Sequence, residues 1–223
     1  AAGKQLKIVA NYAVGFNNID CAAAKQHGVI VTNTPGELLT EAVAEHTIAL
    51  LFALAKRIPE SDRYVRAERF KGWAPMLLLG MLLKGKTLGI VGLGRIGRAV
   101  AARAVRGLGM RVVYYDVQRD AAFEREFSAR RLSLLQIFRQ SDAVTIHVPL
   151  LPATHHLVST KELAQMKSTA FLINTSRGPV VDEKALVVAL QKKKMGGAGL
   201  DVFECEPSID CDISDHLELK RFE

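Results

Sequence analysis

The sequence has 223 residues, 49% hydrophobic and 24% charged, so it contains enough apolar side chains to bury a core. The formal net charge of +7 favours anionic partners, but the basic residues are scattered, and the lysine run at residues 192–194 ends a predicted helix, so we expect no nucleic-acid surface. The three cysteines form no CxxC pair, which excludes a disulfide framework and a cysteine zinc site. The most apolar stretch, residues 76–83, is too short to span a membrane, and no signal peptide is evident, so we expect a cytoplasmic protein.

The first 36 residues contain two short apolar runs with one helical pattern between them. They predict two strands and a helix, at residues 7–10, 29–32 and 21–26. The turn at Pro35 and Gly36 ends this segment. We expect residues 1–36 to be part of a second domain.

A long connecting helix is predicted next. Thr40 and Glu41 precede a periodic apolar run, which is typical of a helix capped by Thr40 and extending to about Lys56. Pro59 is typical of a helix start and predicts a second helix to about Phe70.

Apolar, β-branched runs alternate with helical patterns between residues 87 and 202. This alternation predicts a parallel sheet flanked by helices, and hence an α/β fold. The predicted strands, each buried, are residues 87–91, 111–115, 143–148, 170–174 and 198–201. The predicted helices are at about residues 96–107, 133–139, 160–166 and 182–193.

A glycine motif, Gly-Leu-Gly-Arg-Ile-Gly at residues 92–97, follows the first of these strands and opens a helix. Gly92 permits a tight turn, Gly94 lets backbone N–H groups reach a pyrophosphate, and Gly97 lets the helix pack closely on the strand. The next strand ends at Asp116, nineteen residues after Gly97, where a carboxylate can accept the ribose hydroxyls of a dinucleotide. The ordered set predicts a dinucleotide site in a Rossmann-type doubly wound parallel sheet rather than a glycine-rich turn of an unrelated α/β fold.

Asp116 also bears on the choice of cofactor. Its charge repels the 2′-phosphate of NADP, while its oxygens accept hydrogen bonds from a free hydroxyl, so NAD is favoured and NADP is less favoured. Arg119 can offset this preference by pairing with a phosphate, although a surface role for that arginine is the simpler interpretation.

Polar residues follow two later strands of the predicted sheet, where ligands of open α/β sheets collect. Arg177 follows one of them and can hold a carboxylate in bidentate fashion and polarise a carbonyl. Glu206 follows the last strand and can orient a histidine and raise its pKa. Taken alone, both residues are also consistent with structural ion pairs.

The chain resembles the D-isomer-specific 2-hydroxyacid dehydrogenases, and within them the glyoxylate and hydroxypyruvate reductases. The resemblance runs from about Leu6 to Pro207 and rests on the segments at residues 14–20, 33–36, 92–97, 147–149, 174–178 and 199–207. It implies hydride transfer between C4 of a nicotinamide and the 2-carbon of a small 2-oxo or 2-hydroxy acid. It also implies a homodimer formed through the helix and loop around Trp73.

Individual roles follow from the resemblance alone. Arg177 matches the catalytic arginine, which also contacts cofactor and substrate, and Glu206 matches the catalytic glutamate. The backbone N–H groups of Val14 and Gly15 match the cradle for the substrate carboxylate, and Asp201 matches the contact to the nicotinamide carboxamide. The other matched cofactor positions, at the pyrophosphate and along the cofactor, are Arg95, Ile96, Val148, Pro149, Thr154, Thr175 and Ser176.

The resemblance divides the chain into a partial flavodoxin-like substrate domain (1–36), a dinucleotide-binding domain with its connecting helix (37–205) and the start of a return to the substrate domain (206–223). The family's catalytic histidine lies in a Pro-His-Ile-Gly-like segment after the glutamate, and this sequence has none. We therefore expect a fragment, truncated at both ends and weakly active. An NAD(H)-sensing interaction module, as in related corepressors, is the alternative.

The other histidines are not expected to replace the missing one. His216 lies in a predicted loop, His46 is expected to be a satisfied residue of the connecting helix, and the backbone of His147 matters more than its ring. His155 and His156 are adjacent and lack the i, i+4 spacing of helical metal ligands, so no metal site is predicted.

Overall fold

The computed structural model describes residues 5–204. Its contacts divide the chain into two units, residues 1–42 and residues 43–223, and each unit is described by itself. The domain limits inferred from the sequence, 1–36, 37–205 and 206–223, stay predictions.

The smaller unit contains a two-stranded parallel sheet, β1 (Ile8–Ala10) and β2 (Ile30–Thr32), connected through α1 (Cys21–Gln26). The helix begins after Asp20, whose side chain accepts a hydrogen bond from the N–H of Ala23 at 2.8 Å. These elements confirm the prediction, with each strand one residue shorter at its start.

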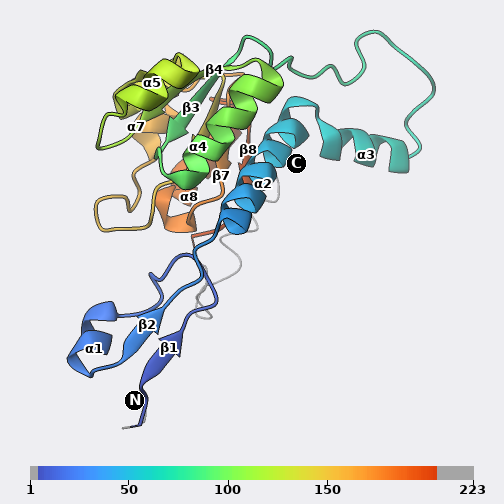
Figure 1. Ribbon diagram of the computed structural model, residues 1–223. Helices are drawn as coiled ribbons and strands as arrows, with labels where there is room; N and C mark the ends of the chain where they lie inside the picture. Colours follow the sequence, from blue (N-terminus) through green and yellow to red (C-terminus); the bar gives the residue numbers. More distant parts are fainter. Residues whose placement is uncertain (1–4, 205–223) are drawn as a thin grey trace. The chain divides into compact units, whose positions relative to one another are not determined.

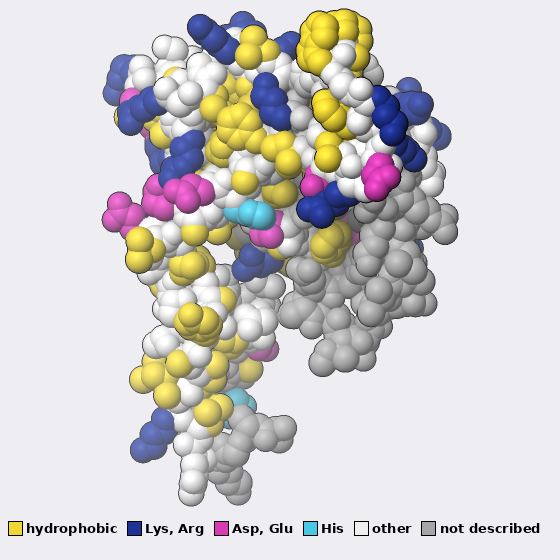
Figure 2. Space-filling view, turned by 90° about the vertical axis from the view of Figure 1, so that its right-hand side faces the viewer, with side chains coloured by type: hydrophobic (Ala, Val, Ile, Leu, Met, Phe, Trp, Pro, Cys, Tyr) yellow, Lys and Arg dark blue, Asp and Glu magenta, His cyan; other side chains and the backbone are white. Residues whose placement is uncertain are grey.

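Two strands and one helix cannot cover both faces of their own sheet. Large hydrophobic side chains of this unit are accordingly exposed: Leu6, Ile8, Tyr12, Val14, Phe16, Ile30, Leu38 and Leu39. In Figure 2 such side chains are spread over the lower part of the view, with few charged groups among them.

The larger unit is built on a six-stranded sheet in which every pair of neighbours is parallel. The strands are β3 (Thr87–Val91), β4 (Arg111–Tyr115), β5 (Arg130–Arg131), β6 (Ala143–Ile146), β7 (Phe171–Asn174) and β8 (Gly197–Leu200). Their order across the sheet is β5-β4-β3-β6-β7-β8. This is the order of a doubly wound dinucleotide-binding sheet, with its switch point between β3 and β6, and it confirms the predicted Rossmann-type fold.

Helices cover both faces of this sheet. One core cluster joins α2 (Glu37–Ala55), α4 (Arg95–Ala102) and α5 (Ala121–Phe127) to residues such as Leu88 and Ile90. The other joins α6 (Leu134–Gln140), α7 (Thr160–Leu163) and α8 (Glu183–Gln191) to alternate strand residues such as Leu172. Figure 1 shows α2 and α4 in front of the strands.

Several predicted boundaries differ from the structure. Helix α2 begins at Glu37 rather than at a Thr40 cap, and the Thr40 hydroxyl instead donates to the Gly36 carbonyl one turn back, at 3.1 Å. The predicted helix at residues 96–107 is α4 followed by a π-helical turn, Arg103–Gly107, and the one predicted at 160–166 ends at Leu163. Both α5 and β5 were missed.

Helix α2 is long and apolar enough to meet a length-and-composition test for a membrane span, which corrects the statement that residues 76–83 are the most apolar stretch. Its residues Ala44, Thr47, Leu51 and Ala55 are buried in the core of the larger unit. A core helix commonly passes such a test, so the result is weak evidence for a membrane.

Helix α3 (Ile58–Arg66) contributes no buried residue, and it is shorter than predicted, since it ends four residues before Phe70. The chain after it returns to the end of α2, where the Met81 N–H donates to the Ala55 carbonyl at 2.7 Å. Between these points lie exposed apolar residues, including Trp73, which is 86% exposed. In Figure 2, hydrophobic and basic side chains share the upper part of the view.

Candidate active site at the carboxyl edge of the sheet

The glycine turn lies at the switch point of the sheet. Gly92 follows β3 with φ +97, a conformation that L side chains rarely adopt, and its N–H donates to the Tyr115 carbonyl at 2.9 Å. A Cβ on Gly92 would lie 2.8 Å from the backbone carbon of His147 and 2.9 Å from Val148 Cγ1. The turn is therefore packed against the end of β6, and only glycine fits there.

The other two glycines of the motif have opposite surroundings. A Cβ on Gly97 would lie 2.2 Å from the Gly92 carbonyl oxygen, so Gly97 brings α4 close to the turn. A Cβ on Gly94 would meet no atom within 4 Å. Gly94 is the N-cap of α4 and gives the helix no side-chain cap, so its first N–H groups have no side-chain acceptor there.

Asp116 follows β4 and is aimed at the same turn. Its Oδ2 accepts a hydrogen bond from the Leu93 N–H at 2.7 Å, and its Oδ1 accepts one from the Gln118 N–H at 3.1 Å. A carboxylate has about four lone-pair sites, so acceptor capacity remains for two ribose hydroxyls. Arg131, from the missed strand β5, donates to the Asp116 carbonyl at 2.8 Å and fixes the backbone there.

Arg119 is paired within the protein. Its guanidinium donates to Glu124 Oε2 at 2.7 Å, and this hydrogen bond raises the pKa of Arg119 and lowers the pKa of Glu124. The surface interpretation of Arg119 is thus the one that the structure supports. Both residues, with Tyr115, Arg130 and Arg131, help to line an open hollow of about 680 Å³ beside the end of β4.

These observations test whether the turn can hold a dinucleotide. Gly94 leaves room for a group in front of the helix, α4 presents uncapped N–H donors to it, and Asp116 has spare acceptors on the neighbouring strand. Arg95 and Ile96 begin the helix, and Arg95 is exposed. The described residues therefore fit a dinucleotide.

The segment after β7 forms a tight turn around Asn174, which is 1% exposed. Asn174 Oδ1 accepts hydrogen bonds from the Ser176 N–H at 3.0 Å and its hydroxyl at 2.8 Å, and Asn174 Nδ2 donates to the Arg177 carbonyl at 3.0 Å. The Arg177 side chain donates from Nη1 to the Ser176 carbonyl at 2.6 Å. Asn174, which was not among the predicted site residues, thus shapes the turn that carries Arg177.

The hydroxyls predicted to line the cofactor are used within the protein. Thr175 Oγ1 lies 2.9 Å from Thr47 Oγ1 of α2, in a buried pair. Thr154 Oγ1 donates to the Pro149 carbonyl at 2.6 Å and accepts from the Leu151 N–H at 2.8 Å. We therefore assign these side chains a role in shaping the loops.

Gly178 brings the segment after β8 against the Arg177 turn. A Cβ on Gly178 would lie 1.8 Å from the Phe203 carbonyl oxygen and 2.4 Å from the Glu204 nitrogen. Gly178 therefore permits a backbone contact that no side chain would allow. Glu206, two residues further on, lies outside the described residues.

The structure gives the surroundings of two histidines at this edge, His46 and His147. His46 of α2 is paired, as expected, but its partner is Asp201, the predicted carboxamide contact, with Nε2 3.1 Å from Oδ1. Burial lowers the pKa of His147 to about 3, and among residues 5–204 its Nε2 has no hydrogen-bond partner. His147 is therefore neutral in the folded protein.

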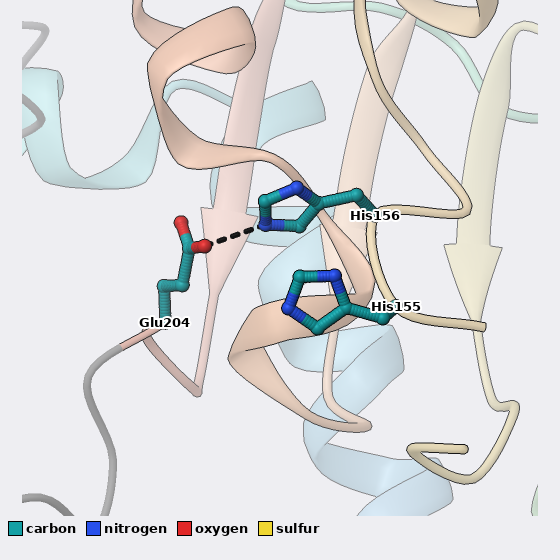
Figure 3. Close-up of side chains that lie close together, drawn as sticks. All are labelled: His155, His156 and Glu204. Atoms are coloured by element: carbon teal, nitrogen blue, oxygen red, sulfur yellow. Dashed lines mark hydrogen bonds and ion pairs between the residues drawn. The ribbon is translucent and has the colours of Figure 1, made fainter. Parts of the chain in front are cut away.

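His156 forms an unpredicted pair. Its Nε2 lies 2.5 Å from Glu204 Oε1, and its ring packs against His155 with the ring centroids 4.1 Å apart (Figure 3). No local sequence pattern predicts this pair, because its two residues are 48 positions apart.

In the smaller unit, Val14 and Gly15 lie on a loop after β1. Their carbonyls accept hydrogen bonds from the side chains of Asn33 at 2.8 Å and Asn11 at 2.7 Å. Within residues 5–204, neither backbone N–H is hydrogen bonded. Two donors are thus available, as a carboxylate cradle requires.

Comparison with known proteins identifies relatives of this chain. The family model of the D-isomer specific 2-hydroxyacid dehydrogenase, NAD binding domain, matches residues 48–219. A glyoxylate reductase of Korarchaeum cryptofilum is 52% identical over 92% of this chain and 62% of its own length. One of Thermococcus litoralis is 51% identical over 91% of this chain and 62% of its own length.

Solved structures agree in fold. A D-lactate dehydrogenase from Aquifex aeolicus, complexed with NAD and lactic acid, has a TM-score of 0.85 at 34% identity, over 97% of this chain and 66% of that one. This chain thus spans less than two thirds of the curated relatives it matches. The matched model is an NAD binding domain, which confirms NAD as the cofactor. The chain belongs to the D-isomer specific 2-hydroxyacid dehydrogenase family, within which it matches the NAD binding domain.

Proposed function

We propose that the protein transfers a hydride between NAD(H) and a small D-2-hydroxy or 2-oxo acid of the glyoxylate or hydroxypyruvate type. The observation that carries this proposal is the set of groups at the carboxyl edge of one sheet. There the open turn at Gly94, the Asp116 carboxylate and the Arg177 guanidinium follow β3, β4 and β7. The relatives named glyoxylate reductase support the substrate class.

In this proposal the pyrophosphate lies at the N-terminus of α4, against Gly92, Gly94, Arg95 and Ile96, and Gly97 supports the turn from behind. Asp116 accepts the ribose hydroxyls, and its charge disfavours a 2′-phosphate. Because Glu124 pairs with Arg119, that arginine offsets the preference only weakly, so we expect NAD to bind better than NADP.

Along the cofactor, the walls are the backbone and side chains of Val148 and Pro149 and the loops that Thr154, Thr175 and Ser176 shape. Asp201 contacts the carboxamide, and His46 orients its carboxylate. Bound NAD supplies the hydride acceptor or donor at C4 of the nicotinamide.

For the substrate, Arg177 binds the carboxylate and polarises the 2-carbonyl, and it also borders the cofactor. The free N–H groups of Val14 and Gly15 supply further carboxylate donors. Glu206 would hold the histidine that moves the proton.

Steady-state assays with NADH and either glyoxylate or hydroxypyruvate test the proposal. Arg177→Lys keeps the charge but loses the bidentate geometry, so we expect kcat/KM to fall about a hundredfold. Arg139→Lys, at an exposed position of α6, is the matched control and should leave the rate unchanged. NADH binding without turnover, both by this chain and by a version extended through a Pro-His segment, would instead favour the sensing module.

We also propose that the chain forms a homodimer through α3 and the segment that follows it. The supporting observation is a set of exposed apolar residues on that segment: Phe70, Trp73, Met76, Leu79 and Leu82. Sedimentation should give the mass of a dimer, and a monomer at micromolar concentration would contradict this part. A cytoplasmic location stays a prediction.

A further inference from the structure

A compact set of metal-binding side chains lies beside the active-site edge. His155 and His156 belong to the loop between β6 and α7, and Glu204 follows β8. One ligand atom from each of the three residues lies within 4.8 Å of the other two. Figure 3 shows both rings projecting from the loop on the side that faces Glu204.

The backbone around all three residues is held in place. The His155 N–H donates to the Leu151 carbonyl at 3.0 Å, and the His156 N–H donates to the Pro179 carbonyl at 2.8 Å. His156 has φ 50, a left-handed conformation that histidine adopts more readily than most side chains. The Glu204 N–H donates to a Glu183 carboxylate oxygen, which anchors the third residue.

The local charge favours a cation. Asp182 and Glu183, at the start of α8, add two carboxylates to that of Glu204, and the Glu204 carboxylate also accepts from the Glu183 N–H at 3.4 Å. The other two members of the cluster, His155 and His156, carry imidazoles, which bind metal ions as neutral ligands.

From this arrangement we propose that His155, His156 and Glu204 bind a divalent transition-metal ion of the zinc type. Two imidazole nitrogens with one carboxylate oxygen form a ligand set that suits zinc and leaves a coordination position open. Ligand atoms around tetrahedral zinc are about 3.4 Å apart. On binding, the His156–Glu204 pair, which is 2.5 Å apart, therefore has to open, and the exposed His155 ring has to move closer, each by roughly 1 Å. The spacing of the two adjacent histidines predicts no metal site, but the third ligand comes from a distant segment of the chain.

The site would join two segments next to the proposed catalytic residues. Glu204 precedes Glu206 by two positions, and the Phe203–Glu204 backbone contacts Gly178, which follows Arg177. A bound ion would fix this segment to the loop at residues 151–157. Metal binding does not depend on the proposed reaction, so an experiment can disprove the metal site without disproving the reaction, and the reverse.

The experiment is a calorimetric titration of the 223-residue chain, without an affinity tag, with Zn²⁺. All samples carry serine in place of Cys21, Cys205 and Cys211, so that thiols cannot bind the ion. His155→Ala is the decisive variant, because it removes a ligand and keeps the His156–Glu204 pair. Glu204→Gln removes a second ligand, and His27→Ala, at another exposed histidine, is the matched control.

We expect saturable binding of one ion per chain, with affinity roughly tenfold or more lower in His155→Ala and Glu204→Gln and unchanged in His27→Ala. Zn²⁺ should also raise the melting temperature of the parent but not of His155→Ala. Without Zn²⁺, parent and His155→Ala should melt together, because the ring is exposed. Absence of saturable binding, equal affinity in His155→Ala, or equally tight binding of Mg²⁺ would overturn the site.

Discussion

The two edges of the six-stranded sheet carry polar groups of different kinds. At the amino edge, Asp142 is only 9% exposed, and its two oxygens accept hydrogen bonds from the Thr87 N–H and from Lys167, both at 2.8 Å, so its carboxylate is closed to a ligand. At the carboxyl edge, Gly94 leaves open space and α4 begins without a side-chain cap. The amino edge therefore stabilises the fold, whereas the carboxyl edge retains unused hydrogen-bonding capacity for a ligand.

The largest expected effect is that of Gly178→Ala. The new Cβ would lie 1.8 Å from the Phe203 carbonyl oxygen, so the backbone has to shift. We expect a loss of about 3 kcal/mol or more in the free energy of unfolding, measured by urea denaturation, because the clash is with backbone atoms. Gly107→Ala is the control, because its Cβ would meet nothing within 4 Å. Equal stability of the two variants would show that the segment after β8 does not pack on the Arg177 turn.

A second comparison separates folding from binding within the glycine turn. Gly97→Ala places a Cβ 2.2 Å from the Gly92 carbonyl oxygen, so we expect it to lower both stability, by about 1–3 kcal/mol, and NADH affinity. Gly94→Ala should leave the melting temperature unchanged and weaken NADH binding roughly tenfold, or about 1.4 kcal/mol. Normal NADH binding by Gly94→Ala would remove the pyrophosphate from this turn.

Substitution of Asp142 should lower the stability of the fold without changing NADH binding, and the size of the loss should depend on pH. Burial raises its pKa, but the hydrogen bonds from Lys167 and the Thr87 N–H and the charges of Lys167 and Lys86 outweigh this, so the pKa is below the usual value of 3.8. The ionised carboxylate therefore stabilises the fold above about pH 4, and this contribution is lost as the pH falls through the lowered pKa.

We expect Asp142→Asn to cost about 1.5–3 kcal/mol at pH 7. Urea midpoints of parent and variant should approach each other below about pH 4, while NADH affinity at pH 7 stays unchanged. A difference in stability that stays constant down to pH 3 would show that the charge of Asp142 contributes nothing.

Local sequence patterns determined how much of the fold could be predicted. Strands β3 and β4 were predicted to the residue, because long apolar, β-branched runs lie between turn residues. Strand β5 has two residues, both arginines, and α5 is short, so neither gives a periodic signal. Thr40 was misassigned as a cap because the pattern of a hydroxyl before an acid also occurs within a helix.

The same distinction applies to the candidate site, where local motifs could be predicted and pairs between distant segments could not. The glycines and Asp116 form a local motif with a fixed spacing, and the structure brings them together. The pairs His46–Asp201 and His156–Glu204 join distant segments, so only the tertiary fold reveals them. The roles of Arg177 and Glu206 rest on the family resemblance, and Glu206 lies outside the described residues.

We propose that the turn at residues 92–97 and Asp116 hold NAD. Fluorescence titration of the parent chain and of Asp116→Ala with NADH and NADPH tests it most directly, with Asp116→Asn as a variant that keeps an acceptor for the Leu93 N–H. We expect the parent to prefer NADH, and Asp116→Ala to lose about 1.5–3 kcal/mol of NADH binding but much less of NADPH binding. Equal weakening of both cofactors, or no change in either, would contradict the account.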